Sequence, residues 1–129
     1  MHPFRAAVQA GEHDAIAAVM AEDVTLLSPV VFAPYRDRDT VAAIVVAAGR
    51  ALEDFQYERE IVDGRDAALV FKARVGDREV HGCDFVRLDE HGQIEELTVM
   101  VRPLSGAHAL RDAMSVQLEV VKRELGLAA

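Results

Sequence analysis

The hydrophobic pattern changes its period from about 3.6 residues to 2 near Phe55, and this change constrains the fold more than any other feature of the chain. From Phe55 to Arg102, apolar residues alternate with polar ones in four segments of strand length. Three turn signals separate these segments, at residues 63–64, 76–77 and 89–92. Strands joined by tight turns pair with their sequence neighbours, so the pattern predicts an antiparallel meander of four strands.

Helical spacing flanks this predicted meander on both sides. Before it, the expected elements are helices at 2–10, 12–21 and 39–51, a strand at 23–28 and an apolar loop at 30–34. After Pro103, a longer helix is expected at 106–124, with Ser105 as its N-cap and Gly126 just beyond its end. Helices followed by a curled antiparallel sheet place the chain in the α+β class.

Composition narrows the choice of partners and of compartment. The 129 residues carry a net charge of −8, which argues against nucleic acid or an anionic membrane as the main partner. The single cysteine, Cys83, excludes an internal disulfide and fits a reducing cytoplasm. No apolar run approaches the roughly 20 residues of a membrane span, and the N-terminus has no signal-peptide pattern. We therefore expect a soluble cytoplasmic protein.

Asp84 breaks the pattern of its strand. It lies mid-strand on a face that otherwise carries apolar residues and glycine, from Val80 to Leu88. A charged and unpaired carboxylate on such a face costs several kcal/mol, and burial raises the pKa of the carboxyl. Two interpretations stay open. Either a protonated Asp84 donates a hydrogen bond to a ligand in a pocket, or Asp84 pairs with a basic group, for which Arg59 is the candidate.

The other reactive side chains form no recognisable site. Strand parity places His81 and Cys83 on the face of the sheet opposite to Asp84. The remaining histidines lack metal-ligand spacing, and the chain has neither a glycine-rich phosphate loop nor a nucleophile elbow. The sequence therefore predicts no metal and no cofactor. Tyr35 and Tyr57 are the only phenols, and each is a candidate hydrogen-bond donor in a cleft.

Three segments resemble the nuclear-transport-factor-2-like superfamily, which includes ketosteroid isomerases and SnoaL-like polyketide cyclases. They are Gly11–Ile16, Met20–Val24 and Asp84–Ile94, the last of which is close to the ketosteroid-isomerase pattern. The resemblance extends from Phe4 to about Arg102. It implies one SnoaL-like domain over residues 1–129. In that domain a cone-shaped curled antiparallel sheet wraps around the N-terminal helices, and an additional C-terminal helix follows.

The isomerase catalytic positions carry over one at a time. Asp84 falls where the isomerases have a protonated aspartic acid in the oxyanion hole. Phe4 falls on the oxyanion-hole tyrosine and has no hydroxyl, and Ser28 falls on the general-base aspartate. Arg102 stands at about the place where many SnoaL-like proteins have an acidic residue. The resemblance therefore implies the fold and a pocket, and it counts against both known mechanisms, since this fold supports many chemistries.

Three functions stay open at this point. The first is binding of a small, mostly apolar molecule in the cone, with Asp84 as the polar anchor. The second is an isomerase, cyclase, hydratase or hydrolase that uses Asp84, and the third is a dimeric structural module with a vestigial pocket. The expected pocket residues are Phe4, Ser28, Phe32, Ile44, Val45, Tyr57, Phe71, Val86, Leu97 and Val99.

A homodimer through the outward face of the sheet is also expected. Val70, Phe85 and Met100 point outward by strand parity, and the apolar stripe of the last helix runs over residues 110–125. Together they give more apolar surface than one small domain leaves uncovered. Members of the superfamily that the chain resembles commonly dimerise in this way.

Overall fold

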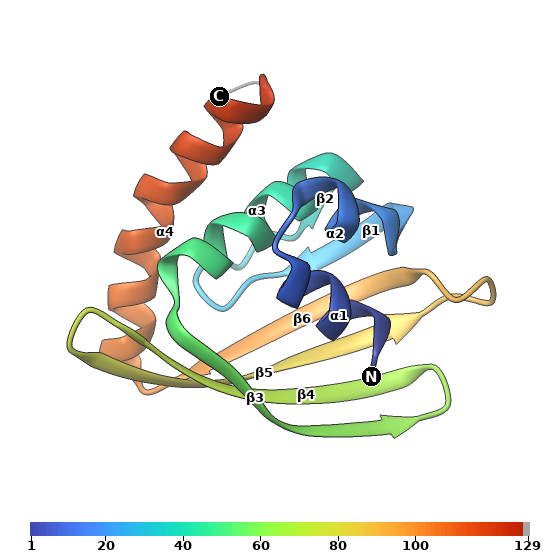
Figure 1. Ribbon diagram of the computed structural model, residues 1–129, viewed down its shortest axis with the longest axis horizontal. Coiled ribbons are helices and arrows are strands. Elements are labelled where there is room, and N and C mark those ends of the chain that lie inside the picture. Colours follow the sequence, from blue (N-terminus) through green and yellow to red (C-terminus); the bar gives the residue numbers. More distant parts are fainter. Residues whose placement is uncertain (128–129) are drawn as a thin grey trace.

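A computed structural model of the chain describes residues 1–127 as one curled sheet with helices over one of its faces (Figure 1). The elements are α1 (Pro3–Ala10), α2 (His13–Ala18), β1 (Met20–Leu27), β2 (Tyr35–Arg36), α3 (Arg38–Ala51), β3 (Glu53–Asp63), β4 (Asp66–Val75), β5 (Arg78–Leu88), β6 (Ile94–Arg102) and α4 (Leu104–Leu125). Helices α1, α2 and α3 lie over the sheet, and α4 rises at the end where β4 turns into β5 (Figure 1). The predicted α+β class is confirmed. No described helix is both long and apolar enough to cross a membrane.

Strands β3 to β6 form the antiparallel meander that the alternating pattern predicts. The complete sheet has the order β2-β1-β6-β5-β4-β3, and it is mixed because β1 pairs with β6 in parallel. Tight turns fix the direction only of strands that follow one another, whereas α3 and most of the meander separate β1 from β6 in the chain. The expectation of a wholly antiparallel sheet is therefore wrong at this one pair.

The boundary between α2 and β1 lies earlier than expected. Helix α2 ends at Ala18 and β1 begins at Met20, rather than at residues 21 and 23. The backbone N–H of Ile94 donates to the carbonyl oxygen of Val19 at 2.9 Å, so contact with the start of β6 takes the place of a further helical turn.

The last helix begins two residues earlier than the capping signal predicts. Its N-cap is Pro103 rather than Ser105, and no side chain caps it. Its end is as predicted, because Gly126 adopts the left-handed conformation with φ 69° and its N–H donates to the Arg123 and Lys122 carbonyls.

A β-bulge in β3 reverses the inward and outward positions along the second half of that strand. Tyr57 pairs with Phe71 and Arg59 with Val70, so β3 advances two residues while β4 advances one. Glu60 consequently turns inward and is half-buried, whereas Arg59 is exposed. The expectation that Arg59 shares the inner face with Tyr57 is wrong because simple alternation contains no bulge. The bulge also removes Arg59 as a candidate partner of Asp84, which was one of the two interpretations left open.

Two buried clusters lie between the helices and the sheet. The larger cluster packs α1, α2 and α3 on the inner face and contains Phe4 and Ile16, and the smaller lies toward α4 and contains Phe71 and Leu110. Both Leu110 and Val121 of α4 are buried against this chain's own elements. Most of the α4 stripe is therefore covered within the chain, whereas Leu125 at its end is exposed.

Candidate functional site

A cavity of about 160 Å³ lies between the inner face of the sheet and helices α1, α3 and α4. Three side chains of its lining are polar among the described residues, namely Ser28, Tyr57 and Asp84, and the rest of the wall is mainly apolar. The full lining is Phe4, Val8, Leu26, Ser28, Pro29, Ile44, Val45, Ala48, Gly49, Leu52, Phe55, Tyr57, Phe71, Asp84, Leu97, Val99, Val101, Leu110 and Met114. An apolar chamber with few polar groups is the usual form of a small-molecule site.

Asp84 is held in this wall by the middle of β5. Its cross-strand neighbours are Leu69 on β4 and Val99 on β6, so both flanks of the carboxyl are apolar. The Asp84 side chain is buried, and the Tyr57 hydroxyl donates to its Oδ2 at 2.9 Å. Tyr57 comes from β3, one strand beyond β4, and reaches Asp84 diagonally across the sheet.

Burial raises the pKa of the Asp84 carboxyl to about 7, and the hydrogen bond from Tyr57 opposes part of this rise. Burial also raises the pKa of Tyr57, and the neighbouring Asp84 carboxylate raises it further. Tyr57 therefore keeps its proton at neutral pH, while Asp84 is present in both its neutral and its charged form. A neutral carboxyl donates a hydrogen bond to a ligand oxygen, whereas the carboxylate only accepts one.

A second layer from α1 holds the Tyr57 ring in place. The Arg5 guanidinium lies 5.5 Å from the centre of that ring, and its Nη1 lies 3.7 Å from Oε1 of Glu60. The same Glu60 oxygen accepts from the backbone N–H of His2 at 3.3 Å. Because the bulge turns Glu60 inward, the start of the chain and β3 are tied together beside the cavity.

The floor of the cavity is aromatic. The rings of Phe55 and Phe71 stack with their centres 4.9 Å apart, and Tyr57 meets Phe55 edge-on at 4.8 Å. Gly82 makes this packing possible, because a Cβ at that position would collide with the Phe71 ring and lie 2.7 Å from the Met100 carbonyl oxygen. The absence of a side chain at Gly82 therefore lets Phe71 lie close against β5.

Most of the residues predicted for the pocket are brought together in its lining. They are Phe4, Ser28, Ile44, Val45, Tyr57, Phe71, Asp84, Leu97 and Val99. Val86 lies one inward position beyond Asp84 on β5, and it packs in the core beside its neighbour Leu97 instead of facing the cavity. It supports the wall without lining it, because the N-terminal helices fill that part of the inner face.

Phe32 lies outside the cavity and is fully exposed, so the expectation that it closes the pocket is wrong. Two features turn the loop 30–34 outward. The Ser28 hydroxyl accepts from the backbone N–H of Val30 at 3.1 Å, and Tyr35 and Arg36 pair with β1 at the edge of the sheet. This short pairing, β2, was not expected from the sequence.

The sequence also missed part of the lining. Phe55 shares the inward parity of Tyr57, so the alternating pattern already contained the signal for it. Leu110 and Met114 lie at helical spacing on the apolar stripe of α4. The sequence predicts this stripe, but helical spacing does not determine which surface the stripe packs against.

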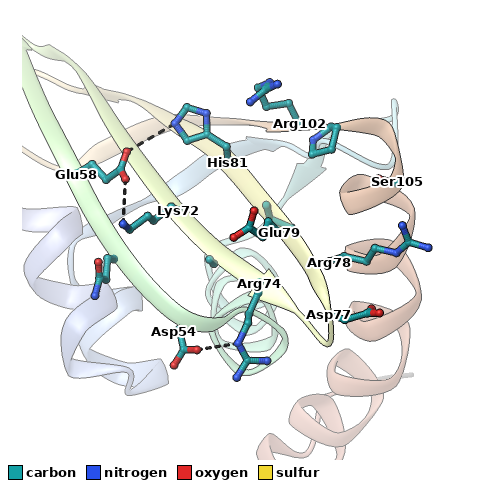
Figure 2. Close-up of a pocket in the computed structure, with 14 residues that line it drawn as sticks. Asp54, Glu58, Lys72, Arg74, Asp77, Arg78, Glu79, His81, Arg102 and Ser105 are labelled. Atoms are coloured by element: carbon teal, nitrogen blue, oxygen red, sulfur yellow. Dashed lines mark hydrogen bonds and ion pairs between the residues drawn. The ribbon is translucent and has the colours of Figure 1, made fainter.

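The outer face of the same sheet carries a larger and charged hollow of about 850 Å³ (Figure 2). Its lining includes Glu58, which lies 3.6 Å from Lys72 Nζ and 3.8 Å from His81 Nε2. Farther along, Arg74 Nε lies 2.7 Å from Asp54 Oδ2. His81 is thus on the outer face, as parity predicts. No cluster of three or more His, Cys, Asp or Glu side chains among residues 1–127 is arranged to hold a metal ion.

Comparison with protein families and solved structures gives consistent matches. A family model described as the SnoaL-like domain matches residues 2–97. An uncharacterized protein with a cystatin-like fold from Silicibacter pomeroyi is 35% identical, with a TM-score of 0.87 over 98% of this chain and 92% of that one. A steroid delta-isomerase from Pseudomonas aeruginosa is 34% identical, with a TM-score of 0.85 over 91% of this chain and 87% of that one.

A de novo designed protein with a curved β-sheet shares only the fold. It is 12% identical, with a TM-score of 0.70 over 88% of this chain and 96% of that one. A comparison with curated protein sequences found no significant match.

Proposed function

The chain belongs to the SnoaL-like family, and we propose that it binds a small, mostly apolar molecule in its cavity, with Asp84 as the hydrogen-bonding anchor. One observation carries this proposal: a buried carboxyl with a raised pKa lines an otherwise mainly apolar chamber. Burying a carboxyl in such a place lowers the stability of the fold. A ligand oxygen that accepts a hydrogen bond from the carboxyl recovers part of this cost.

Isomerisation of a steroid is the competing proposal, because a steroid delta-isomerase is among the similar structures. That reaction moves a proton between carbon atoms and needs a general base. Ser28, at the position where the resemblance implies the base, already accepts a hydrogen bond from the loop, and Phe4 supplies no hydroxyl. Because general acid–base catalysis contributes about 10²–10⁴-fold, we expect turnover of a 5-ene-3-ketosteroid far below that of a true isomerase. Turnover within tenfold of such an isomerase would refute this expectation and favour isomerisation over ligand binding alone.

Binding is tested with a panel of cyclic ketones that have one to four rings, titrated into the protein and followed by NMR shifts or calorimetry. We expect at least one ketone to bind, Asp84→Asn to retain most of that binding, and Asp84→Ala to weaken it about 5- to 150-fold. Asp77→Asn, in the turn on the outer side of the sheet, is the matched control and leaves the affinity unchanged. The proposal is contradicted if no ketone binds, or if Asp84→Ala binds the ketone as tightly as the wild-type protein does.

An enzyme that uses Asp84 itself as acid and base is the second candidate. The observation in its favour is the pKa of about 7 together with the Tyr57 hydrogen bond, since proton transfer is most effective with a pKa near the working pH. The open cavity and the outward Phe32 argue against the third candidate, a vestigial pocket that is packed solid.

A homodimer through the outer face of the sheet remains part of the proposal. Phe85 and Met100 are exposed there, and Met100 is the cross-strand neighbour of Cys83. The free thiol of Cys83 is compatible with the cytoplasm as the proposed compartment. Sedimentation of the protein at tens of micromolar tests the dimer, and a monomer at that concentration would contradict it.

A further inference from the structure

We propose that the cavity selects a molecule with a single ring and one oxygen substituent, such as a cyclic enone, and excludes fused-ring molecules of steroid size. This inference rests on the proposed function, because it names the class of ligand that the Asp84 site takes.

The volume of the chamber limits the size of the ligand. An apolar protein cavity of about 150 Å³ holds one benzene molecule, and pockets for drug-sized ligands span about 300–1,000 Å³. At about 160 Å³, the chamber of this protein has room for one six-membered ring and its oxygen. The four fused rings of a steroid do not fit in this space.

The shape of the chamber favours a ring over an open chain. The lining is rich in aromatic rings: Phe55 stacks on Phe71, Tyr57 meets both of them edge-on, and Phe4 adds a ring from α1. Aromatic faces pack well against planar rings at centre-to-centre distances of about 4.5–7 Å. The aromatic floor is fixed from below, because Phe71 lies directly against Gly82.

The hydrogen-bonding atom for the ligand is also defined. Tyr57 donates to Oδ2 of Asp84, which leaves Oδ1 as the oxygen free to meet a ligand. The Tyr57 hydroxyl is bonded to Asp84 and the Ser28 hydroxyl accepts from Val30, so a mainly apolar wall with Asp84 Oδ1 as its anchor matches a ligand with one oxygen and an apolar remainder.

Helix α4 closes the far end of the chamber. Leu110 and Met114 contribute to the wall, and Leu110 is fully buried in the cluster that contains Phe71. Packing of α4 on α3 and an ion pair between Arg50 Nη2 and Glu124 Oε2, at 2.9 Å, hold the helix over this end. Shortening Met114 therefore lengthens the chamber without touching Asp84 or Tyr57.

The test uses three ketones of increasing size: cyclohex-2-enone with one ring, 1-tetralone with two and androst-4-ene-3,17-dione with four. Their affinities for the wild-type protein are measured by calorimetry. We expect cyclohex-2-enone to bind at least tenfold more tightly than 1-tetralone, and the steroid not to bind. Met114→Ala should raise the affinity for 1-tetralone at least tenfold relative to cyclohex-2-enone. Met100→Ala, the same change on the exposed outer face, should leave both affinities unchanged.

The wild-type series does not depend on the stability of any variant. Steroid or tetralone binding as tight as that of cyclohex-2-enone, and lost in Asp84→Ala, would overturn the size selection and leave the proposed function standing. If no ketone binds, or if binding persists in Asp84→Ala, the proposed function fails and the size selection fails with it.

Discussion

Two carboxyl groups on the two faces of one sheet behave in opposite ways. Asp66 lies on the outer side of β4 opposite Arg87, whose Nε donates to its Oδ1 at 2.9 Å, and this hydrogen bond lowers the pKa of Asp66. Asp84 lies on the inner side of β5 among apolar neighbours, and burial raises its pKa to about 7. The pKa of the same side-chain type is lowered on one face and raised on the other, because desolvation dominates at Asp84 and the hydrogen bond from Arg87 dominates at Asp66.

The two hollows extend this contrast. The inner chamber is small and mainly apolar, with Asp84 and Tyr57 bonded to each other, whereas the outer one is large and lined by ion pairs such as Lys72 with Glu58. Because strand residues alternate between the faces, Phe71 and Lys72 are sequence neighbours that serve different chambers. Within one chain, the inner face buries Asp84, whereas the ion-paired side chains of the outer face are exposed.

The largest effect that sharpens this contrast is the pH dependence of stability. The pKa of Asp84 is about 7 in the folded protein and about 3.9 in the unfolded chain. As the pH rises, the unfolded chain therefore loses this proton at a lower pH than the folded protein does. Asp84 therefore destabilises the fold increasingly as the pH rises above 3.9, and the effect levels off above about 7. Relative to the wild type, Asp84→Asn should therefore gain more unfolding free energy at pH 8 than at pH 4, with a difference of up to about 4 kcal/mol. Urea denaturation at both pH values measures it.

Asp66→Asn is the control for this experiment, and its effect has the opposite sign. A lowered pKa contributes stability above the unfolded value, and that stability is lost as the pH falls through the folded value. Asp66→Asn should thus lose stability at pH 8 and little at pH 3. Greater loss of stability at pH 8 than at pH 4 in Asp84→Asn would identify Asp84 as a paired carboxylate instead.

The next effect concerns the support of the aromatic floor. Gly82→Ala places a methyl group into the Phe71 ring and against the Met100 carbonyl, so it should destabilise the fold by about 1–3 kcal/mol and reduce ketone binding. Gly49→Ala, in α3 where an added Cβ would meet no atom within 4 Å, should instead gain up to about 1 kcal/mol from helix propensity. Thermal unfolding of both variants compares them, and equal stabilities would argue against the close Phe71–Gly82 contact.

A smaller effect is expected from the Tyr57 hydroxyl. Tyr57→Phe removes the hydrogen bond that lowers the pKa of Asp84, so that pKa should rise further, at a cost of about 1 kcal/mol in unfolding free energy. Tyr35→Phe, at the other edge of the sheet, is the matched control and should leave the pKa of Asp84 unchanged. NMR titration of Asp84 in both variants decides the point, and a lower pKa in Tyr57→Phe would contradict it.

The smallest effect is expected on the outer face. The contacts of Glu58 with Lys72 and His81 are solvent-exposed and longer than 3.5 Å. Exposed ion pairs contribute little, so His81→Ala should change the unfolding free energy by less than about 0.5 kcal/mol. A loss of unfolding free energy above 1 kcal/mol in chemical denaturation would show that the charged contacts of the outer face contribute substantially to stability.

The features that the sequence predicted are those with a regular period. The meander, the third helix and the inward position of Asp84 each follow from alternation or helical spacing over many residues. The features that it did not predict depend on a single residue that interrupts the regular period, or on contacts between residues far apart in the sequence. The bulge that exposes Arg59 falls in the polar run Glu58–Glu60, so it leaves no hydrophobic signature in the sequence of β3.

The candidate site was predicted in part for the same reason. Phe4 and Leu97 follow from their helix and strand faces, whereas the outward turn of Phe32 depends on the pairing of β2, which only two residues form. The contribution of Met114 depends on how α4 packs over the end of the sheet. Such tertiary contacts have no counterpart in the local pattern.

The inner face of the sheet holds Asp84 as a buried carboxyl with a raised pKa. Titration of the Asp84 side-chain carboxyl by ¹³C NMR between pH 3 and 9, with its signal assigned by its loss in Asp84→Asn, measures this directly. We expect a midpoint of about 7 for Asp84 and a midpoint below the ordinary value for Asp66 in the same spectra. A midpoint for Asp84 at or below the ordinary value of about 3.9 would contradict it.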